Sequence, residues 1–349
     1  MLDIEKMKQI TEQLHVVAAS KQFGRDGSRA LADLISAITR IYKTVEPSLR
    51  QLPLTIFICP NAGVDLEPLV GPAKATVAKP DLVTHELDGA CLVDVSHGSR
   101  LSIFEAANVD KIELSKHALV YEFDTQAEHF FIDGERYRVT NPTSQPSIYA
   151  APTYSSLAEA LERFSKTVVL TNSCFILDEC WADDKRIFLK PGPERNMRRS
   201  LHQFLRAAFP DAEVRPEQIV DESHPVDIKV TWNDTNKRAL IEIKWLGKSL
   251  DQAKGKFTSK HSDSRALEGA KQLADYMESD KTAAPGHRSR GYLVVIDARR
   301  RSVKETTKTV TPAQGLYYRS REIKYNPEFH NLRNDFEKPI RMFAEPVLN

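Results

Sequence analysis

The sequence predicts a mixed α/β protein of two domains, in which an amino-terminal α/β domain precedes a mixed sheet flanked by helices. Short apolar runs of strand length alternate with amphipathic helical stretches along the chain. The 349 residues are enough for two hydrophobic cores. A loop-like stretch with three prolines, residues 141–153, separates the two parts. We therefore expect one domain at residues 1–165 and a second at 166–349, with its core at about 190–300.

The composition limits the classes of function. Hydrophobic residues make up 41% and charged residues 28% of the chain, as in ordinary soluble proteins. The 49 Lys and Arg balance 48 Asp and Glu, so any surface for nucleic acid must be local. The four cysteines form no C-x-x-C pair, which argues against a structural zinc site and favours reduced thiols. No signal peptide or membrane span is visible, so we expect a cytoplasmic protein without a membrane partner.

The first domain is expected to begin with helices and continue with strands. Apolar residues fall on one helical stripe in residues 28–42, and residues 3–20 are also helical in pattern. Strands are expected at residues 54–59, 91–95, 118–123 and 130–139, the last with a turn at Asp133-Gly134. Asp94 and His97 are the one candidate for a site in this domain, but a lone His in a glycine-containing loop is typical of a surface, so no chemistry is expected here.

The second domain is expected to alternate helices and strands. A helix is expected at 155–164, strands at 167–170 and 174–177, and a helix from Pro191 to about residue 209. Further on, a helix is expected at 264–278, a buried strand at 291–297, and a last helix at 329–343 that is broken near Pro339.

Residues 225–245 are expected to form a hairpin that brings two carboxylates together. Residues 226–232 alternate apolar and polar side chains, and residues 240–245 are a second strand-like run. Asn and Asp favour turns, which centres the turn between Asp234 and Thr235. Facing residue numbers then add up to 469, so Asp227 lies opposite Glu242 with Cβ atoms about 5 Å apart. Lys244 shares the face of Glu242.

Two facing carboxylates suit a hard cation such as Mg²⁺, because they repel each other unless a positive charge lies between them. Lys244 beside the ion could orient or deprotonate an attacking water. The alternative is a Glu/Lys surface patch on an ordinary hairpin. Glu194, in the first turn of its helix, either serves only the helix dipole or joins the metal site through water. The residue pattern leaves both alternatives open.

A basic, glycine-containing loop is expected directly after the hairpin. It contains Lys248, Lys254, Lys256 and Lys260, and a phosphate backbone could lie on it. The alternative is a solvated, mobile loop. Three residues just before the hairpin, Asp221, Glu222 and His224, are candidates for substrate contact.

These elements together resemble the PD-(D/E)xK nuclease superfamily. The resemblance rests on Glu194 in a helix, Pro225-Val226-Asp227, Glu242-Ile243-Lys244 and the pair Gln272 and Tyr276 in the next helix. The Gln-x-x-x-Tyr element is similar to the RecB-like branch, which includes nucleases with an iron-sulfur cluster. The cysteines here are not suitably placed for one, so no cluster is expected. The resemblance covers residues 190–300 and implies a restriction-endonuclease-like fold.

The resemblance also implies roles for individual residues. Asp227, Glu242 and the backbone carbonyl of Ile243 would bind Mg²⁺ or Mn²⁺, with Glu194 as an outer or additional ligand. Lys244 would position the hydrolytic water and stabilise charge on the phosphate. Gln272 and Tyr276 would fix the metal-site strand or touch the scissile strand.

The expected function is metal-dependent hydrolysis of phosphodiester bonds, most readily in DNA. By analogy with the superfamily, a role in restriction or anti-phage defence is expected, and the first domain would sense a small-molecule activator, recognise DNA or mediate assembly with a second copy or a defence partner. Two alternatives remain open: a catalytically silent protein that binds nucleic acid or mediates assembly, and a nuclease directed at RNA.

Overall fold

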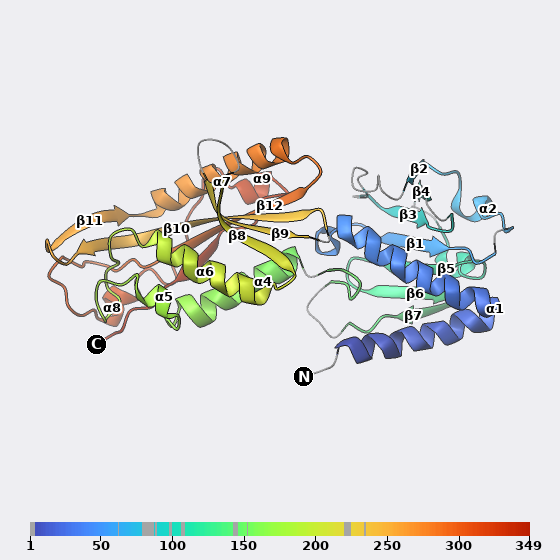
Figure 1. Ribbon diagram of the computed structural model, residues 1–349, viewed down its shortest axis with the longest axis horizontal. Helices are drawn as coiled ribbons and strands as arrows, with labels where there is room; N and C mark the ends of the chain where they lie inside the picture. The colour runs from blue at the N-terminus through green and yellow to red at the C-terminus, as the bar shows by residue number, and fades with distance from the viewer. Residues whose placement is uncertain are drawn as a thin grey trace. The chain divides into compact units, whose positions relative to one another are not determined.

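The chain folds into two compact units, Met1–Ser155 and Ser156–Asn349 (Figure 1). The computed structural model describes residues 4–61, 63–78, 87, 89–97, 100–105, 109–141, 146–151, 153–219, 225–233 and 235–349. The expected boundary after residue 165 lies at the far end of helix α4 (Tyr154–Phe164). This helix belongs to the second unit, where the ring of Phe164 packs against that of Phe204 at a centroid distance of 5.2 Å.

The first unit combines a mixed sheet with one long helix. Its elements are α1 (Ile4–Thr44), η1 (Pro47–Leu49), β1 (Leu54–Ile58), α2 (Glu67–Val70), β2 (Ala75–Ala78), β3 (Cys91–Asp94), β4 (Arg100–Glu105), α3 (Lys111–Leu114), β5 (Leu119–Phe123), β6 (Glu128–Ile132) and β7 (Glu135–Arg138). Within the described residues, seven strands form a sheet in the order β2-β4-β3-β1-β5-β6-β7. Strands β1 and β3 run parallel, and the other neighbours are antiparallel.

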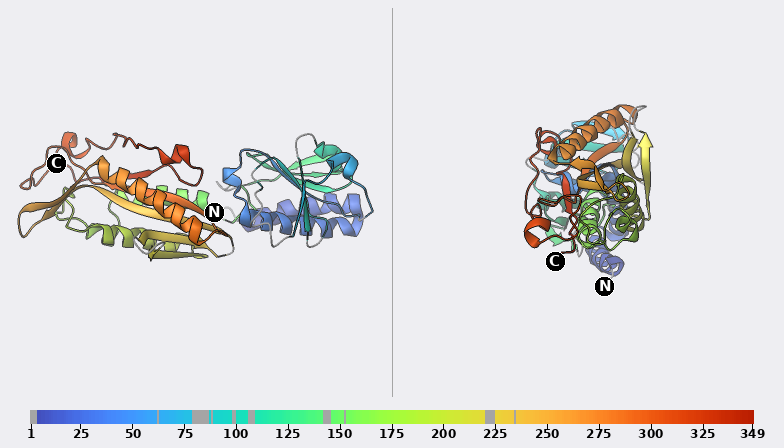
Figure 2. Two further views of the ribbon diagram at one scale, coloured as in Figure 1. Left: turned by 90° about the horizontal axis from the view of Figure 1, so that it is seen from above. Right: turned by 90° about the vertical axis from the view of Figure 1, so that its left-hand side faces the viewer.

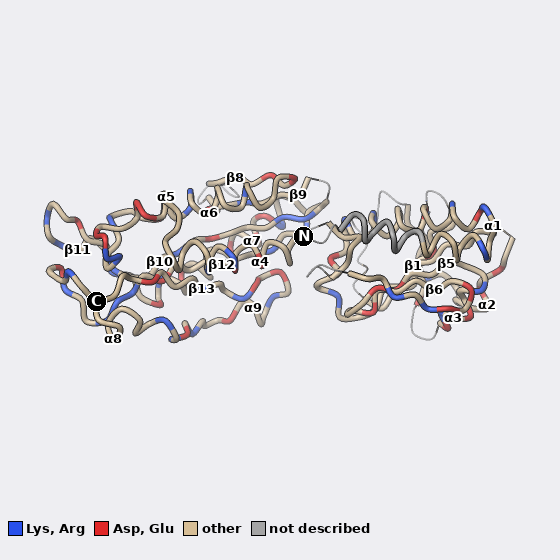
Figure 3. The backbone as a smooth tube through the Cα atoms, turned by 90° about the horizontal axis from the view of Figure 1, so that it is seen from below, with Lys and Arg blue, Asp and Glu red and all other residues tan. Residues whose placement is uncertain are grey.

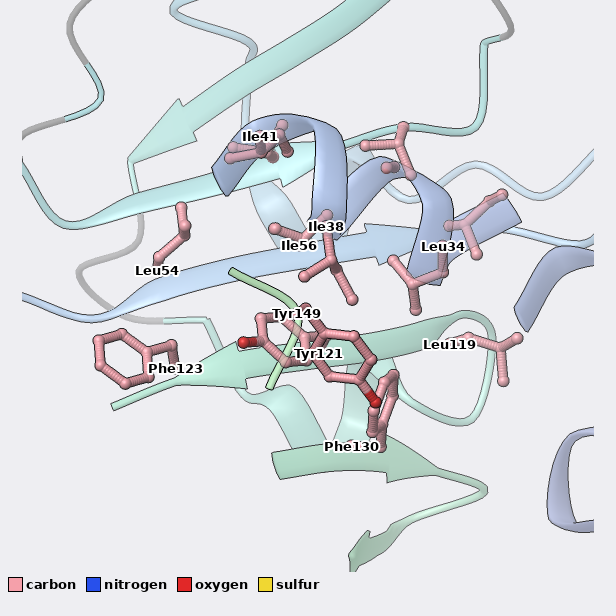
Figure 4. Packing of buried hydrophobic residues seen from close by; sticks show 14 of the residues in the cluster. Leu34, Ile38, Ile41, Leu54, Ile56, Leu119, Tyr121, Phe123, Phe130 and Tyr149 are labelled. Atoms are coloured by element: carbon pink, nitrogen blue, oxygen red, sulfur yellow. The ribbon is translucent and has the colours of Figure 1, made fainter. Parts of the chain in front are cut away.

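Both faces of this sheet are covered. Helix α1 packs Leu34, Ile38 and Ile41 against one face, together with the rings of Tyr121 and Phe130 (Figure 4). A smaller cluster around Phe57, Leu92 and Val120 covers the other face.

A buried carboxylate, Glu128, is part of the core on the α1 side. It accepts hydrogen bonds from the Tyr121 hydroxyl at 2.5 Å, the Ser147 hydroxyl at 2.6 Å and the Ile148 backbone N–H at 3.0 Å. The carboxylate is therefore satisfied by the fold itself, as buried polar groups require.

Most elements expected in the first unit are present. The Asp133-Gly134 turn is confirmed, with φ of 53° and 78° at its two residues, as a hairpin turn of the primed type requires. The two expected helices form one interrupted helix, α1, with a non-helical residue at Gly24 (φ 64°, ψ −144°). Strands β2 and β4 were not expected from the sequence.

The second unit is built around a second mixed sheet. Its elements are α4, the π-helical turn η3 (Ser165–Val169), α5 (Phe175–Asp178), α6 (Glu194–Ala208), β8 (Ala212–Ile219), β9 (Pro225–Trp232), β10 (Lys237–Asp251), β11 (Lys256–His261), α7 (Asp263–Ala283), β12 (Arg288–Asp297), α8 (Pro312–Gly315), α9 (Phe329–Leu332) and β13 (Ile340–Phe343). The strand order is β13-β12-β10-β9-β8, and β11 pairs with the far end of β10.

Helices cover both faces of the second sheet (Figures 1 and 2). Helix α7 lies on one face, where Ala270 and Leu273 pack against Leu240 and Leu293. Helices α4 and α6 lie on the opposite face. The protein is thus an α/β protein with two mixed sheets flanked by helices, as predicted. None of the helices in the described part of the chain combines the length and apolar character that a membrane span needs.

Three expectations for the second unit are wrong. Residues 167–170 and 174–177 are not strands: residues 167–169 belong to η3 and residues 175–177 to α5. The last expected helix is reduced to the short α9, and residues 340–343 instead form β13, which pairs in parallel with β12. The expected basic loop after Lys244 is a β-ribbon made of the end of β10 and of β11.

Candidate functional site

The hairpin of β9 and β10 has the predicted register. Arg238 faces Thr231 and Ile241 faces Ile228, with two pairs between them, so the residue numbers of each pair add up to 469. Asp234, at the centre of the predicted turn, lies outside the described residues, as do Asp221, Glu222 and His224. The paired residues end at Ile241 and Ile228, one step before Asp227 and Glu242. The candidate site therefore begins where this ladder stops.

The side chain of Asp227, a residue of β9, contacts both strand β10 and helix α6. Its Oδ2 accepts the backbone N–H of Ile243 at 2.8 Å, in place of a further strand-to-strand bond. Its Oδ1 accepts a hydrogen bond from Arg198 of α6, also at 2.8 Å. The side chains of Arg198 and Asp227 are 19% and 16% exposed, so this is a mostly buried ion pair. Such pairs are positioned firmly, because breaking one leaves an uncompensated charge.

Glu242 and Lys244 extend from the same face of β10 and are buried together. The Lys244 ammonium donates to Glu242 Oε1 at 2.5 Å, and the two side chains are only 7% and 4% exposed. Burial, the nearby charge of Asp227 and that of Glu194 raise the pKa of the Glu242 carboxyl to about 7, although Lys244 opposes the shift. The two predicted carboxylates are thus close enough to repel each other.

Glu194 opens helix α6 and faces the first turn of α7. Its Oε1 accepts a hydrogen bond from Arg265 at 3.2 Å, and its side chain is 40% exposed. His261, at the end of β11, packs edge-on against Trp245 at 4.4 Å between ring centroids. Burial and the charge of Arg265 lower the pKa of His261, while Glu194 acts in the opposite direction. Glu194, His261 and Arg265 therefore form one border of the site.

The oxygen ligands available at the site determine whether a divalent cation fits there. Among the described residues, no three His, Cys, Asp or Glu side chains are grouped closely enough to hold a metal ion together. Mg²⁺, however, is commonly bound by one or two carboxylates with water and substrate oxygens. Glu242 Oε2 is buried without a hydrogen-bond partner. An unpaired carboxylate oxygen beside a second carboxylate fits a two-carboxylate cation site.

Helix α7 closes the site from the α7 face of the sheet. A Cβ on Gly269 would lie 2.5 Å from Lys244 Cγ and 3.1 Å from Leu293 Cδ1, so the helix rests on the lysine. Gln272 and Tyr276 follow at helical spacing on the same side of the helix. Tyr276 is buried in the core with Val226, while Gln272 Oε1 is buried without a partner. Both residues thus lie at the interface of α7 with the sheet, on the side of Lys244.

The four predicted basic residues fall into two groups on the β10–β11 ribbon. Lys248 donates to the Val303 carbonyl at 2.7 Å and lies 4.8 Å from the Phe257 ring centroid, and Lys260 lies 5.2 Å from that centroid. Lys254 and Lys256 are exposed near the turn of the ribbon. The ribbon extends past the other strands (Figure 1), since residues 247–251 of β10 pair with β11 and not with β12.

The sequence reasoning missed the roles of Arg198, Arg265 and His261. Arg198 stands four residues after Glu194, a spacing that favours a pair within the helix. The structure instead pairs Arg198 with Asp227 and Glu194 with Arg265. No pattern within the chain could reveal these pairs, because they depend on how α6 meets β9 and α7.

No protein-family profile, curated protein or solved structure matches the chain.

Proposed function

We propose that the second unit is a metal-dependent nuclease that hydrolyses phosphodiester bonds, most readily in DNA, with its site at Asp227, Glu242 and Lys244. The observation that carries the proposal is the environment of Glu242. This buried carboxyl has a pKa of about 7, one unpaired oxygen, a second carboxylate nearby and a lysine at 2.5 Å. Such a combination is typical of a functional site and does little to stabilise a fold. The order of acidic residues and helices along the chain, and the mixed sheet, support a restriction-endonuclease-like fold.

In this proposal Asp227, Glu242 and the backbone carbonyl of Ile243 hold Mg²⁺ or Mn²⁺, with Glu194 as an outer ligand. A bound divalent cation would lower the pKa of a water molecule and offset charge on the phosphate. Lys244, next to Glu242, would position the attacking water and stabilise negative charge on the phosphate oxygens. Gln272 and Tyr276 hold α7 against β10, which keeps Lys244 in place.

The rival function is a catalytically silent protein that keeps this fold to bind nucleic acid or a partner. One observation favours it: each of the three carboxylates is paired with a basic side chain, Asp227 with Arg198, Glu194 with Arg265 and Glu242 with Lys244. A protein that never binds a cation would keep these pairs permanently. In a nuclease, a cation at Asp227 would compete with Arg198 for the carboxylate, so the two functions differ in a measurable way.

The decisive experiment uses the purified full-length protein with supercoiled plasmid, linear duplex DNA, single-stranded DNA and RNA. Each substrate is incubated with Mg²⁺, with Mn²⁺ and with a chelator. We expect cleavage that requires the cation and is lost in Asp227→Asn, Glu242→Gln and Lys244→Ala. Cleavage of RNA alone would assign the enzyme to RNA.

The controls separate a missing activity from a misplaced site. Arg199→Gln changes an exposed residue on α6 and should keep full activity. Cleavage that persists in Asp227→Asn and Lys244→Ala would refute the site. Binding of Mn²⁺ to the wild type, measured by calorimetry and lost in Glu242→Gln, supports the site even if an activator is missing from the assay. A protein that neither binds Mn²⁺ nor cleaves any substrate would be the silent one.

A further inference from the structure

Two arginines beyond the end of β12 lie over a single aromatic ring. The guanidinium carbon of Arg301 is 4.4 Å and that of Arg321 is 3.9 Å from the centroid of the Tyr317 ring. Both arginines are exposed. No carboxylate among the described residues forms an ion pair with either of them. The ring orders the two cations while their N–H donors stay available for a ligand.

A buried hub keeps the tyrosine in place. Tyr317 packs edge-on against Tyr318 at 5.0 Å, and Arg299 lies 4.5 Å from the Tyr318 ring centroid. Arg299 and Arg341 both bind the fully buried Asp297, with donor-to-oxygen distances of 2.6 Å and 2.7 Å. Arg341 also donates to the backbone carbonyls of Tyr318 and Arg321, so the aromatic pair is fixed to the carboxyl end of β12. The cationic pair is preorganised, which lowers the entropy lost on binding.

This cationic pair lies at the same end of the sheet as the basic ribbon. Asp297 faces Leu246 of β10, two residues after the pair of Lys244 with Val295. Lys248 joins the ribbon to the segment after β12 through the Val303 carbonyl. Figure 3 shows Lys and Arg on the chain at the end of the second unit that carries β11. Among the described residues, Lys248, Lys256 and Lys260 of the ribbon form no ion pair, and neither do Arg301 and Arg321, so unpaired positive charge gathers at this end of the second unit.

We propose that Arg301, Tyr317 and Arg321 form a binding site for the phosphodiester backbone of nucleic acid. Planar guanidinium groups bind phosphate oxygens through paired N–H donors, and two of them held by one ring can contact successive phosphates of a strand. This inference rests on the proposed function for the identity of the polyanion, and it adds a contact that the three catalytic residues do not make. This site would hold the nucleic-acid strand, while hydrolysis would take place at Asp227 and Glu242.

The test measures binding without cleavage. The full-length protein, in chelator so that no hydrolysis occurs, is titrated into fluorescently labelled duplex DNA, single-stranded DNA and duplex RNA at several salt concentrations. We expect Arg301→Gln and Arg321→Gln each to weaken binding by roughly tenfold, as for a charged hydrogen bond. Each should also reduce the slope of log affinity against log salt on duplex DNA by about 0.9, as for one lost phosphate contact.

Matched variants show whether the ring matters. Tyr317→Phe keeps the ring and should bind like the wild type. Tyr317→Leu removes the ring and should weaken binding as much as an arginine variant does. Arg206→Gln is the control, because Arg206 is exposed near the end of α6, next to the hairpin end of the sheet. The nucleic acid that the arginine variants bind more weakly than the wild type does identifies the ligand as DNA or RNA.

Two results would overturn the inference: losses in Arg301→Gln and Arg321→Gln no larger than in Arg206→Gln, or a wild type that binds no nucleic acid. A wild type that binds nucleic acid through these residues but neither binds Mn²⁺ nor cleaves any substrate would keep this site and refute the nuclease.

Discussion

Arg198 of helix α6 donates a hydrogen bond to Asp227 of strand β9 at 2.8 Å, so that an internal cation stands where the proposed metal would bind. The prediction is that Arg198→Gln raises the affinity for Mn²⁺, because the metal no longer competes with the guanidinium. A charged hydrogen bond of this kind corresponds to roughly tenfold in affinity. Calorimetric titration of the full-length protein measures it, with Arg199→Gln as the control on the same helix. Unchanged or weaker Mn²⁺ binding would show that Arg198 is no competitor.

The pKa of about 7 at Glu242 predicts a pH-dependent stability. The folded protein holds this proton more tightly than the unfolded chain, whose Glu has a pKa near 4.5. The stabilising contribution is therefore complete below pH 4.5 and is lost as pH rises to 7, by roughly 3 kcal/mol in total. Glu242→Gln should lack this decline, so its free energy of unfolding should exceed that of the wild type increasingly from pH 5 to pH 8.

Urea denaturation at several pH values between these limits tests the prediction. The difference between the two curves isolates Glu242 from the other titrating groups. Equal curves would mean that the Glu242 carboxyl is already ionised throughout, as its pairing with Lys244 alone would favour. Loss of folding in Glu242→Gln would point to a structural partner for the carboxylate.

Gly269→Ala should disturb Lys244 without touching a charged group. The new Cβ would lie 2.5 Å from Lys244 Cγ, and the buried lysine has little room to move. We expect a loss of about 1 to 3 kcal/mol in stability from overpacking. Cleavage should fall further than the Tm shift explains, because the ammonium leaves its position at Glu242. Gly286→Ala is the matched control, since nothing lies within 4 Å of its added Cβ. Full activity in Gly269→Ala would show that the position of Lys244 is not critical.

The register of β9 and β10 could be predicted from the sequence because both of its determinants are local. Alternating apolar residues from Val226 to Trp232 set the faces, and the Asn- and Asp-containing segment after them predicts a turn. The pairing of Arg198 with Asp227 could not be predicted, because it depends on the packing of α6 against the sheet. The β-branched run at residues 167–170 was misleading for a related reason. There the hydroxyls of Thr167 and Thr171 bond to carbonyls four residues earlier, and the chain continues as a helical turn.

Strand β13 could not be predicted either, because its pairing partner is distant in the sequence. Residues 340–343 pair in parallel with Val294–Asp297, and Arg341 binds the buried Asp297. A helical pattern through residues 329–343 carries no information about that partner, because strand formation there is decided by an edge of the sheet about 45 residues earlier in the chain.

Lys254→Ala and Lys256→Ala should weaken substrate binding without impairing chemistry. Both side chains are exposed near the turn of the β10–β11 ribbon, and a two-stranded ribbon is narrow enough to enter the major groove of duplex DNA. Each lost phosphate contact should reduce the salt slope on duplex DNA by about 0.9. Cleavage at saturating substrate should stay at the wild-type rate, so the effect appears in KM and not in kcat.

Lys281→Ala is the control for the ribbon. Lys281 is also exposed but lies in the last turn of α7, next to Asp280, which pairs with Arg238 at the start of β10. Unchanged binding in all three variants would show that the ribbon is a solvated surface that does not contact the substrate. A fall in kcat with unchanged KM would instead place the ribbon lysines in the chemical step, which the burial of Asp227, Glu242 and Lys244 argues against. Lys254 is 77% exposed and pairs only loosely with Asp251, at 3.5 Å, so its contribution should be purely electrostatic and should vanish at high salt.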